Sequence, residues 1–122
     1  VEQMINAAAR RVSFMSQEEV LRRIGSDNPG ITLLDVREYD SYQRSHIPGA
    51  ISIPRGQLEL IVDKLLPDPT ARIVVYCQFG KISTLATATL RDMGFMRAIA
   101  MAHGMQTWLE KHYPTSDGVA DC

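Results

Sequence analysis

Short, continuously apolar runs alternate with amphipathic stretches along the whole chain, and this alternation limits the fold more than any other feature. The clearest runs are residues 31–36, which are almost continuously apolar, and 73–76, and such runs are typical of strands covered on both faces, as in parallel sheets. Strands that alternate with helices in this way predict one α/β domain. We expect a central parallel sheet of about five strands with helices on both of its faces.

Local signals place the individual elements. Ser16 opens a Ser-Gln-Glu-Glu sequence, which is a capping-box pattern at the start of a helix. Gly94 is a typical residue at a helix end. We expect helices at residues 1–11, 16–24, 38–45, 57–66, 83–93 and 105–111, and strands at 12–15, 31–36, 50–53, 73–76 and 98–101. The apolar faces predicted for the first and fourth helices consist of Met4, Ile5 and Ala8, and of Leu58, Ile61, Val62 and Leu65.

Composition and charge exclude several classes of protein. Hydrophobic residues make up 45% of the 122 residues and charged residues 22%, which is typical of globular rather than disordered chains. The formal net charge is −1 and no block of like charge occurs, so we expect no binding to nucleic acid or to a membrane. No apolar run approaches the ~20 residues of a membrane helix, and no signal-peptide core is present. Whether a leader was removed before Val1 remains an open question, since the chain does not begin with Met.

The two cysteines lie far apart, at Cys77 and at Cys122 in the polar C-terminal segment. This is no disulfide framework, and it favours a reducing, cytoplasmic setting. We interpret Cys122 as a free tail thiol, because a resolving role for it requires the tail to fold back over the loop after Cys77.

Cys77 has the more informative position, between the predicted strand at 73–76 and a helix. Ligands of parallel α/β sheets bind outside the carboxyl ends of the strands. The loop that follows contains Gly80 and leads into a helix N-terminus, so its N–H groups and the helix dipole favour an anion there. Lys81 adds a full positive charge, and together these features favour the thiolate of Cys77 over the thiol. The alternative is a small, inert core residue at a strand end.

Four segments of the sequence resemble the four signatures of single-domain rhodaneses, in the order and at the spacing of that family. They are LDVRE at 34–38, HIPGA at 46–50, YCQFGKIS at 76–83 and GMQTW at 104–108. The resemblance covers residues 13–113. It leaves an N-terminal helix at 1–12 and a C-terminal tail at 114–122 outside the rhodanese-like domain, and we expect the tail to be frayed from Pro114 onward.

The resemblance implies a sulfurtransferase. Its cysteine, here Cys77, takes a sulfane sulfur as a persulfide from thiosulfate or another persulfide and passes it to a thiol or a protein acceptor. The loop that surrounds the outer sulfur with N–H groups then consists of Gln78, Phe79, Gly80, Lys81, Ile82 and Ser83. Thiolate attack on sulfur proceeds through a covalent intermediate and needs preorganised donors, so we expect neither a metal nor an organic cofactor. We expect a monomer or a weak homodimer.

Three further polar residues match the family signatures. A carboxylate at the end of a buried strand needs a partner, so Asp35 and Arg37 are expected to pair, and Asp35 also has the position to orient the active loop. We interpret His46 as a hydrogen-bonded structural residue rather than an acid or base. The spacing of His46, His103 and His112 fits no metal-ligand pattern, so no metal site is expected.

The sequence departs from the family pattern at three positions. Ile82 stands where catalytic rhodaneses commonly carry Arg or Thr, which predicts weak use of thiosulfate unless Ile82 instead faces the core. His103 replaces the glycine usual before Gly104 and is expected to crowd the neighbouring turn. Phe79 makes the loop less polar, which favours an apolar or protein-borne donor.

Two alternatives to a sulfurtransferase remain open. Phosphatases and arsenate reductases of the related fold have a loop one residue longer, which closes on an arginine after Cys-x5, whereas this chain has Ser83 there. A non-catalytic regulatory module is the other alternative, although such relatives usually lack the cysteine. A persulfide carrier that hands sulfur between proteins lies between the enzyme and the regulatory module.

Overall fold

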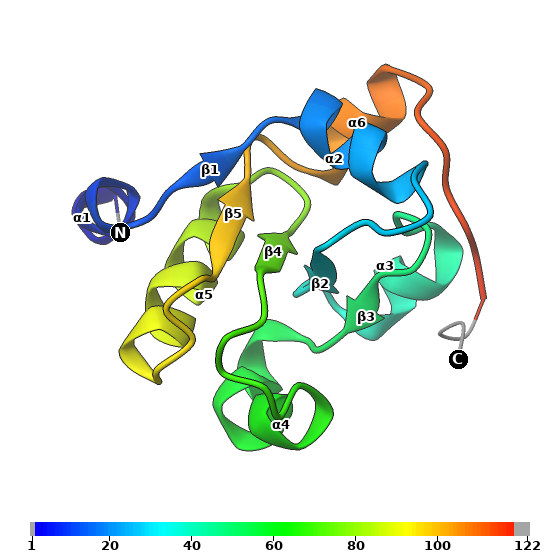
Figure 1. Ribbon diagram of the computed structural model, residues 1–122. Helices are drawn as coiled ribbons and strands as arrows, with labels where there is room; N and C mark the ends of the chain where they lie inside the picture. The colour runs from blue at the N-terminus through cyan, green and yellow to red at the C-terminus, as the bar shows by residue number, and fades with distance from the viewer. Residues whose placement is uncertain (1, 119–122) are drawn as a thin grey trace.

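The computed structural model describes residues 2–118 as a five-stranded parallel sheet with helices packed against it (Figure 1). The strand order is β1-β5-β4-β2-β3, and every pairing is parallel, which confirms the predicted fold class. The strands are β1 (Phe14–Met15), β2 (Thr32–Asp35), β3 (Ile51–Ser52), β4 (Ile73–Tyr76) and β5 (Ile99–Met101). The helices are α1 (Glu2–Arg11), α2 (Gln17–Ile24), α3 (Tyr39–Arg44), η1 (Arg55–Gln57, a 3-10 turn), α4 (Leu58–Leu65), α5 (Lys81–Asp92) and α6 (Met105–Glu110).

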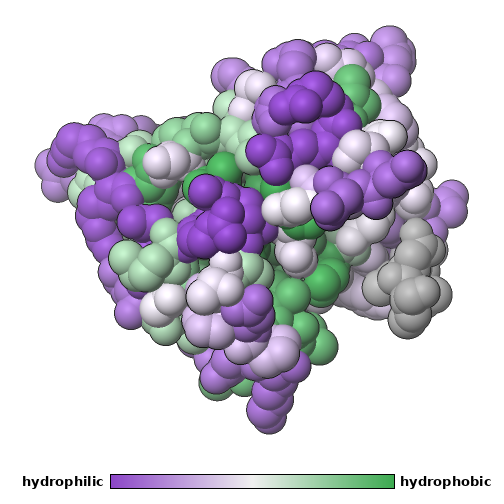
Figure 2. Space-filling model, viewed as in Figure 1, coloured by the Kyte–Doolittle hydropathy of each residue, from purple (hydrophilic) through white to green (hydrophobic). Residues whose placement is uncertain are grey.

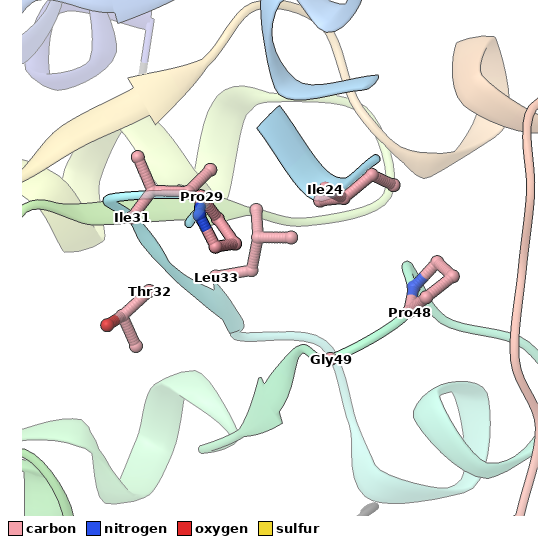
Figure 3. A pocket seen from close by; sticks show the side chains of 7 residues that line it. All are labelled: Ile24, Pro29, Ile31, Thr32, Leu33, Pro48 and Gly49. Atoms are coloured by element: carbon pink, nitrogen blue, oxygen red, sulfur yellow. The ribbon is translucent and has the colours of Figure 1, made fainter. Parts of the chain in front are cut away.

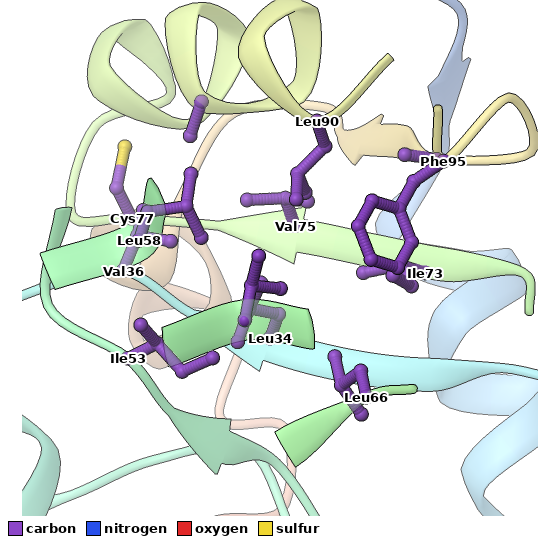
Figure 4. Close-up of a cluster of buried hydrophobic side chains, with 13 residues drawn as sticks. Leu34, Val36, Ile53, Leu58, Leu66, Ile73, Val75, Cys77, Leu90 and Phe95 are labelled. Carbon is purple, nitrogen blue, oxygen red and sulfur yellow. The ribbon is translucent and has the colours of Figure 1, made fainter. Parts of the chain in front are cut away.

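The central strand β4 is buried on both faces because successive side chains enter two separate hydrophobic clusters. Ile73 and Val75 face the cluster covered by α4 and α5, shown in Figure 4. Val74 and Tyr76 face the cluster covered by α2, α3 and α6. All four residues of β4 are fully buried, which explains the unbroken apolar run in the sequence.

Hydrophilic and hydrophobic residues are also separated on the outer surface. On the face seen in Figure 2, hydrophilic residues cover most of the projecting surface, and hydrophobic residues show mainly in the recesses. Helix α1 packs along α5 outside the sheet. None of the helices formed by residues 2–118 is long and apolar enough to cross a membrane.

Two predicted helix faces are corrected by the structure. Helix α4 ends at Leu65, where the side chain is 50% exposed, and the following Leu66 leaves the helical conformation and turns into the core instead. In α1 the buried residue is Ala8, whereas Met4 is exposed. The periodic pattern therefore fails at the last residue of α4 and at Met4 in the first turn of α1.

The expected fraying after Pro114 is wrong for residues 114–118. The indole of Trp108 donates a hydrogen bond to Pro114 O at 2.8 Å, and the backbones of His46 and Ser116 exchange hydrogen bonds at 2.9 and 2.8 Å. Gly118 N donates to Gln43 O at 2.7 Å. These contacts hold the segment against α3 and α6. Cys122 lies outside the described residues.

Candidate active site

Cys77 directly follows β4 at the carboxyl end of the sheet, where its side chain is 3% exposed. Figure 4 shows its sulfur at the margin of the α4–α5 cluster, directed toward α5. The backbone is anchored from the other side of the sheet, because Met105 N donates to Cys77 O at 2.8 Å and Gln106 N donates to Gln78 O at 3.1 Å. The first turn of α6 therefore fixes the position of the Cys77 loop, by which we mean residues 77–83.

Two backbone N–H groups point at the sulfur. Gly80 N and Ser83 N lie 3.1 and 3.2 Å from Cys77 Sγ, and Ser83 Oγ lies 3.3 Å from it. Both N–H groups belong to the N-terminal end of α5, where the first turn has no intrahelical acceptors and the helix dipole is positive. This N–H cradle, formed by Gly80 N and Ser83 N, favours negative charge on the sulfur.

Helix α5 begins at Lys81, two residues earlier than the sequence predicted. Gly80 is its N-cap with φ of +100°, a conformation that side chains with a Cβ rarely adopt. The early start places Lys81 and Ile82 in the first helical turn. Ile82 is 51% exposed, so the alternative that its side chain faces the core is wrong.

The Cys77 loop touches the turn before α6 through backbone atoms. A Cβ on Gly80 would lie 2.7 Å from His103 O, and a Cβ on Gly104 would lie 2.4 Å from Gln78 O. The predicted crowding by the His103 side chain is wrong, since that side chain is exposed. What the residue contributes instead is a left-handed backbone, with φ of +64°.

Asp35 and Arg37 form the predicted buried pair at the end of β2. Arg37 Nη2 lies 2.8 Å from Asp35 Oδ2, and Arg37 N and Nε donate to the same carboxylate. The two side chains are 0% and 8% exposed. Arg37 Nη1 extends the pair to the Cys77 loop, at 3.3 Å from Gln78 Oε1. Asp35 therefore reaches the loop through Arg37.

Tyr76 supports the same corner of the sheet. Burial, and then the nearby Asp35 carboxylate, raise the pKa of Tyr76 well above its ordinary value, so its hydroxyl stays protonated. That hydroxyl accepts a hydrogen bond from Ile47 N at 3.1 Å. The guanidinium of Arg37 lies over the Tyr76 ring at 5.9 Å from its centroid.

His46 is buried away from the Cys77 loop. Its Nδ1 lies 2.8 Å from Tyr42 O, and its ring stacks on the Tyr42 ring with centroids 3.8 Å apart. None of its hydrogen bonds within residues 2–118 reaches the loop. Within the same residues, no three His, Cys, Asp or Glu side chains gather as a metal site would require.

Two hollows open beside Cys77, and both are also lined by Gln78 and Ile82. The smaller, of about 200 Å³, is completed by Phe79 and Lys81. The larger, of about 430 Å³, is completed by Val36, Arg37, Glu38, Ser41 and Arg44. We call this larger hollow the α3 cavity. Sequence reasoning missed Glu38, Ser41 and Arg44, although a helix that follows β2 must start at the same edge of the sheet as Cys77.

A third cavity, of about 410 Å³, lies near the opposite end of β2 (Figure 3). Its lining is Ile24, Pro29, Ile31, Thr32, Leu33, Pro48 and Gly49. None of these lining side chains is ionisable. Of these cavities, those beside Cys77 contain the nucleophilic sulfur.

The described chain is thus a parallel α/β protein with a cysteine in an N–H cradle at the carboxyl end of its central strand. The family model for the Rhodanese-like domain matches residues 16–111, and the chain belongs to this family.

Named relatives and solved structures give the same family. The chain is 32% identical to a proposed sulfur carrier protein of Bacillus subtilis over 103 residues, which are 84% of this chain and 54% of that protein. It is 33% identical to a thiosulfate sulfurtransferase of Coxiella burnetii over 87 residues, 71% of this chain and 78% of that one. The solution structure of a homodimeric polysulfide-sulfur transferase from Wolinella succinogenes is similar with a TM-score of 0.78 and 31% identity, covering 95% of this chain and 86% of that one.

Proposed function

We propose that the protein is a sulfurtransferase in which Cys77 carries the sulfur as a persulfide. The observation that supports this most is the N–H cradle, in which Gly80 N and Ser83 N approach Cys77 Sγ to within 3.2 Å. The named relatives act in thiosulfate or polysulfide transfer, or are proposed to carry sulfur. The donor is thiosulfate or a persulfide, and the acceptor is a thiol or a protein.

The first step is attack of the Cys77 thiolate on the sulfane sulfur of the donor. With thiosulfate, a bond forms between Sγ and that sulfur, the donor S–S bond breaks, and sulfite leaves with the bonding electron pair. The product is an anionic persulfide on Cys77. The two N–H groups of the cradle stabilise negative charge on the cysteine sulfur before attack.

Positioning comes from outside the loop as well as from within it. Arg37 holds Gln78 from the sheet side, and Met105 N holds the Cys77 carbonyl from α6. Ser83 Oγ and Thr84 Oγ1 both donate to Gly80 O, at 3.2 and 2.7 Å, which fixes the carbonyl of the N-cap away from the sulfur. The donors are therefore preorganised, and the reaction needs neither a metal nor an organic cofactor.

We further propose residues 13–113 as the rhodanese-like domain, with α1 and residues 114–118 as flanking segments that pack on it. Cys77 is a free thiol, as is usual in reducing compartments, and we propose a cytoplasmic setting. We also propose a monomer or a weak homodimer.

Sulfite release from thiosulfate tests the proposal, measured with a thiol acceptor over many turnovers. We expect release by the wild type and none above background by Cys77→Ser, while Cys122→Ser serves as the matched control and retains the activity. Persistent release by Cys77→Ser would overturn the mechanism. One equivalent of sulfur per chain with no further turnover would show a carrier rather than an enzyme.

Hydrolysis of an aryl phosphate separates the related phosphatase chemistry. Phosphatases of this fold close the loop on an arginine, whereas Ser83 occupies that position here and contacts the sulfur. We therefore expect the wild type and Cys77→Ser to hydrolyse the ester equally slowly.

A further inference from the structure

The α3 cavity is larger than a small sulfur anion requires. Its volume of about 430 Å³ falls in the range of pockets that hold organic ligands, and Cys77 is part of its lining. The sulfur donated by thiosulfate needs only the N–H cradle at the mouth of the loop. The remaining volume, which extends along α3, has room for an organic molecule whose own sulfur reaches Cys77.

The charged groups that line the α3 cavity are not equivalent. Arg37 is neutralised by Asp35 and committed to Gln78. Arg44 is the last residue of α3, and Glu38 is its N-cap. Both are exposed, and neither side chain makes a hydrogen bond or ion pair to another residue between 2 and 118. The cavity wall therefore offers one free cation and one free anion, with the Ser41 hydroxyl between them in sequence.

A pair of free opposite charges beside an apolar wall is suited to a zwitterion. A simple dianion gains from Arg44 but is repelled by Glu38, whereas a ligand with both a carboxylate and an ammonium group pairs with both. Val36 and Ile82 supply the apolar wall next to the sulfur.

We infer that the α3 cavity is the acceptor site and that it selects thiols of amino-acid type, with the carboxylate bound by Arg44 and the ammonium group by Glu38. This inference rests on the proposed function, because it requires a persulfide on Cys77. The acceptor thiol first gives its proton to the outer sulfur of the anionic persulfide. The resulting acceptor thiolate then attacks that sulfur, and a new S–S bond forms. The bond from that sulfur to Sγ breaks, and its electron pair returns to Cys77 as the thiolate. The proton stays on the transferred sulfur, so the acceptor leaves as its own persulfide.

Four small thiols test the inference. Cysteine has both charged groups, N-acetylcysteine only the carboxylate, cysteamine only the ammonium group, and 2-mercaptoethanol neither. The protein is loaded with sulfur, loading is verified by intact mass, and the rate constant for sulfur transfer to each thiol is measured. Each rate is compared between wild type and variant for the same thiol, so differences in intrinsic thiol reactivity cancel.

Arg44→Gln is expected to slow transfer to cysteine and N-acetylcysteine by roughly twofold to fivefold, as for one solvent-screened ion pair, and to leave the other two thiols unchanged. Glu38→Gln is expected to slow transfer to cysteine and cysteamine by a similar factor and to spare N-acetylcysteine. Asp40→Asn, on the same helix but outside the cavity lining, and Arg10→Gln on α1 are the matched charge controls and should change none of the rates.

Different results would overturn the acceptor inference and the underlying sulfurtransferase proposal. Normal loading followed by an equal effect of Arg44→Gln on all four thiols, or by no effect on any, would overturn the acceptor inference and leave the sulfurtransferase intact. Failure of the wild type to load at Cys77 would overturn both.

Discussion

Arg37 Nη1 lies 3.3 Å from Gln78 Oε1, so a guanidinium paired with buried Asp35 also holds the residue directly after Cys77. The stability of the sheet edge and the geometry of the Cys77 loop therefore depend on the same side chain. A substitution at Arg37 therefore changes both stability and loop geometry, whereas a substitution at Gln78 changes only the loop contact.

Removing each end of the link is expected to have different consequences. Arg37→Ala leaves the Asp35 carboxylate buried without a cation, and we expect the free energy of unfolding to fall by about 3–5 kcal/mol. Gln78→Ala removes only the loop contact, and we expect a loss of at most about 1 kcal/mol with slower sulfur transfer. Urea unfolding and sulfite release measure the two quantities. Equal destabilisation by both variants would contradict the role given to Arg37.

Ile82 is expected to limit the use of thiosulfate. Because its side chain is half exposed in the first turn of α5, Ile82→Arg buries no charge and should fold normally. The added cation beside the Cys77 opening should lower the KM for thiosulfate by about tenfold, with Ile82→Gln as the uncharged control. A melting curve separates folding from kinetics. An unchanged or higher KM in a stable Ile82→Arg variant would contradict the prediction and favour a protein-borne donor against Phe79.

Lys81 provides the reciprocal test. Its ammonium group is exposed and pairs with Glu2 at 3.3 Å. Lys81→Ala should raise the KM for thiosulfate by roughly twofold to fivefold, since it removes a screened charge near the sulfur. Steady-state kinetics at low and high salt would show the difference shrinking as salt is added. A difference that does not depend on salt would indicate a structural effect instead.

Two substitutions in the turn before α6, Gly104→Ala and His103→Gly, are expected to differ in their effect on stability. Gly104→Ala would place a Cβ 2.4 Å from Gln78 O, and we expect a loss of stability of about 1–3 kcal/mol together with impaired transfer. His103→Gly removes a left-handed, non-glycine residue, and the gain is offset by the entropy of glycine in the unfolded chain. We expect its stability to stay within about 1 kcal/mol of the wild type. Thermal unfolding of both variants checks the contrast, which a well-tolerated Gly104→Ala would contradict.

Gln17 is expected to support the site from a distance. Its buried amide donates to Gly104 O at 2.9 Å and to Ala102 O at 3.2 Å, and so holds the turn that backs the Cys77 loop. Gln17→Ala leaves two carbonyls without this donor and should cost about 1–3 kcal/mol of stability. Gln3→Ala, at an exposed position of α1, is the matched control. Equal melting temperatures for the two variants would contradict this role.

The sequence predicted those features that local patterns encode. The fully apolar run at 73–76 indicated a strand covered on both faces, and the glycine-containing turn after Cys77 indicated a helix start with N–H groups directed at the sulfur. The Asp35–Arg37 pair followed from the cost of a buried carboxylate without a partner.

The remaining features depend on how separate elements pack in space. Arg44 and Cys77 line one cavity because of the direction of α3, which no local pattern in residues 39–44 reveals. The early start of α5 depends on the close fit of Gly80 against His103 O. Residues 114–118 are ordered by hydrogen bonds to His46, which is far away in the sequence, and to the side chain of Trp108 in α6. No local pattern in the C-terminal segment predicts these contacts.

Locating the transferred sulfur tests the central claim most directly. The protein is incubated with thiosulfate and, separately, with a small persulfide, then digested and analysed by peptide mass spectrometry without reduction. We predict that the peptide with Cys77 gains one sulfur atom, and that Cys77→Ser gains none. Sulfur found on Cys122, or retained by Cys77→Ser, would contradict the account.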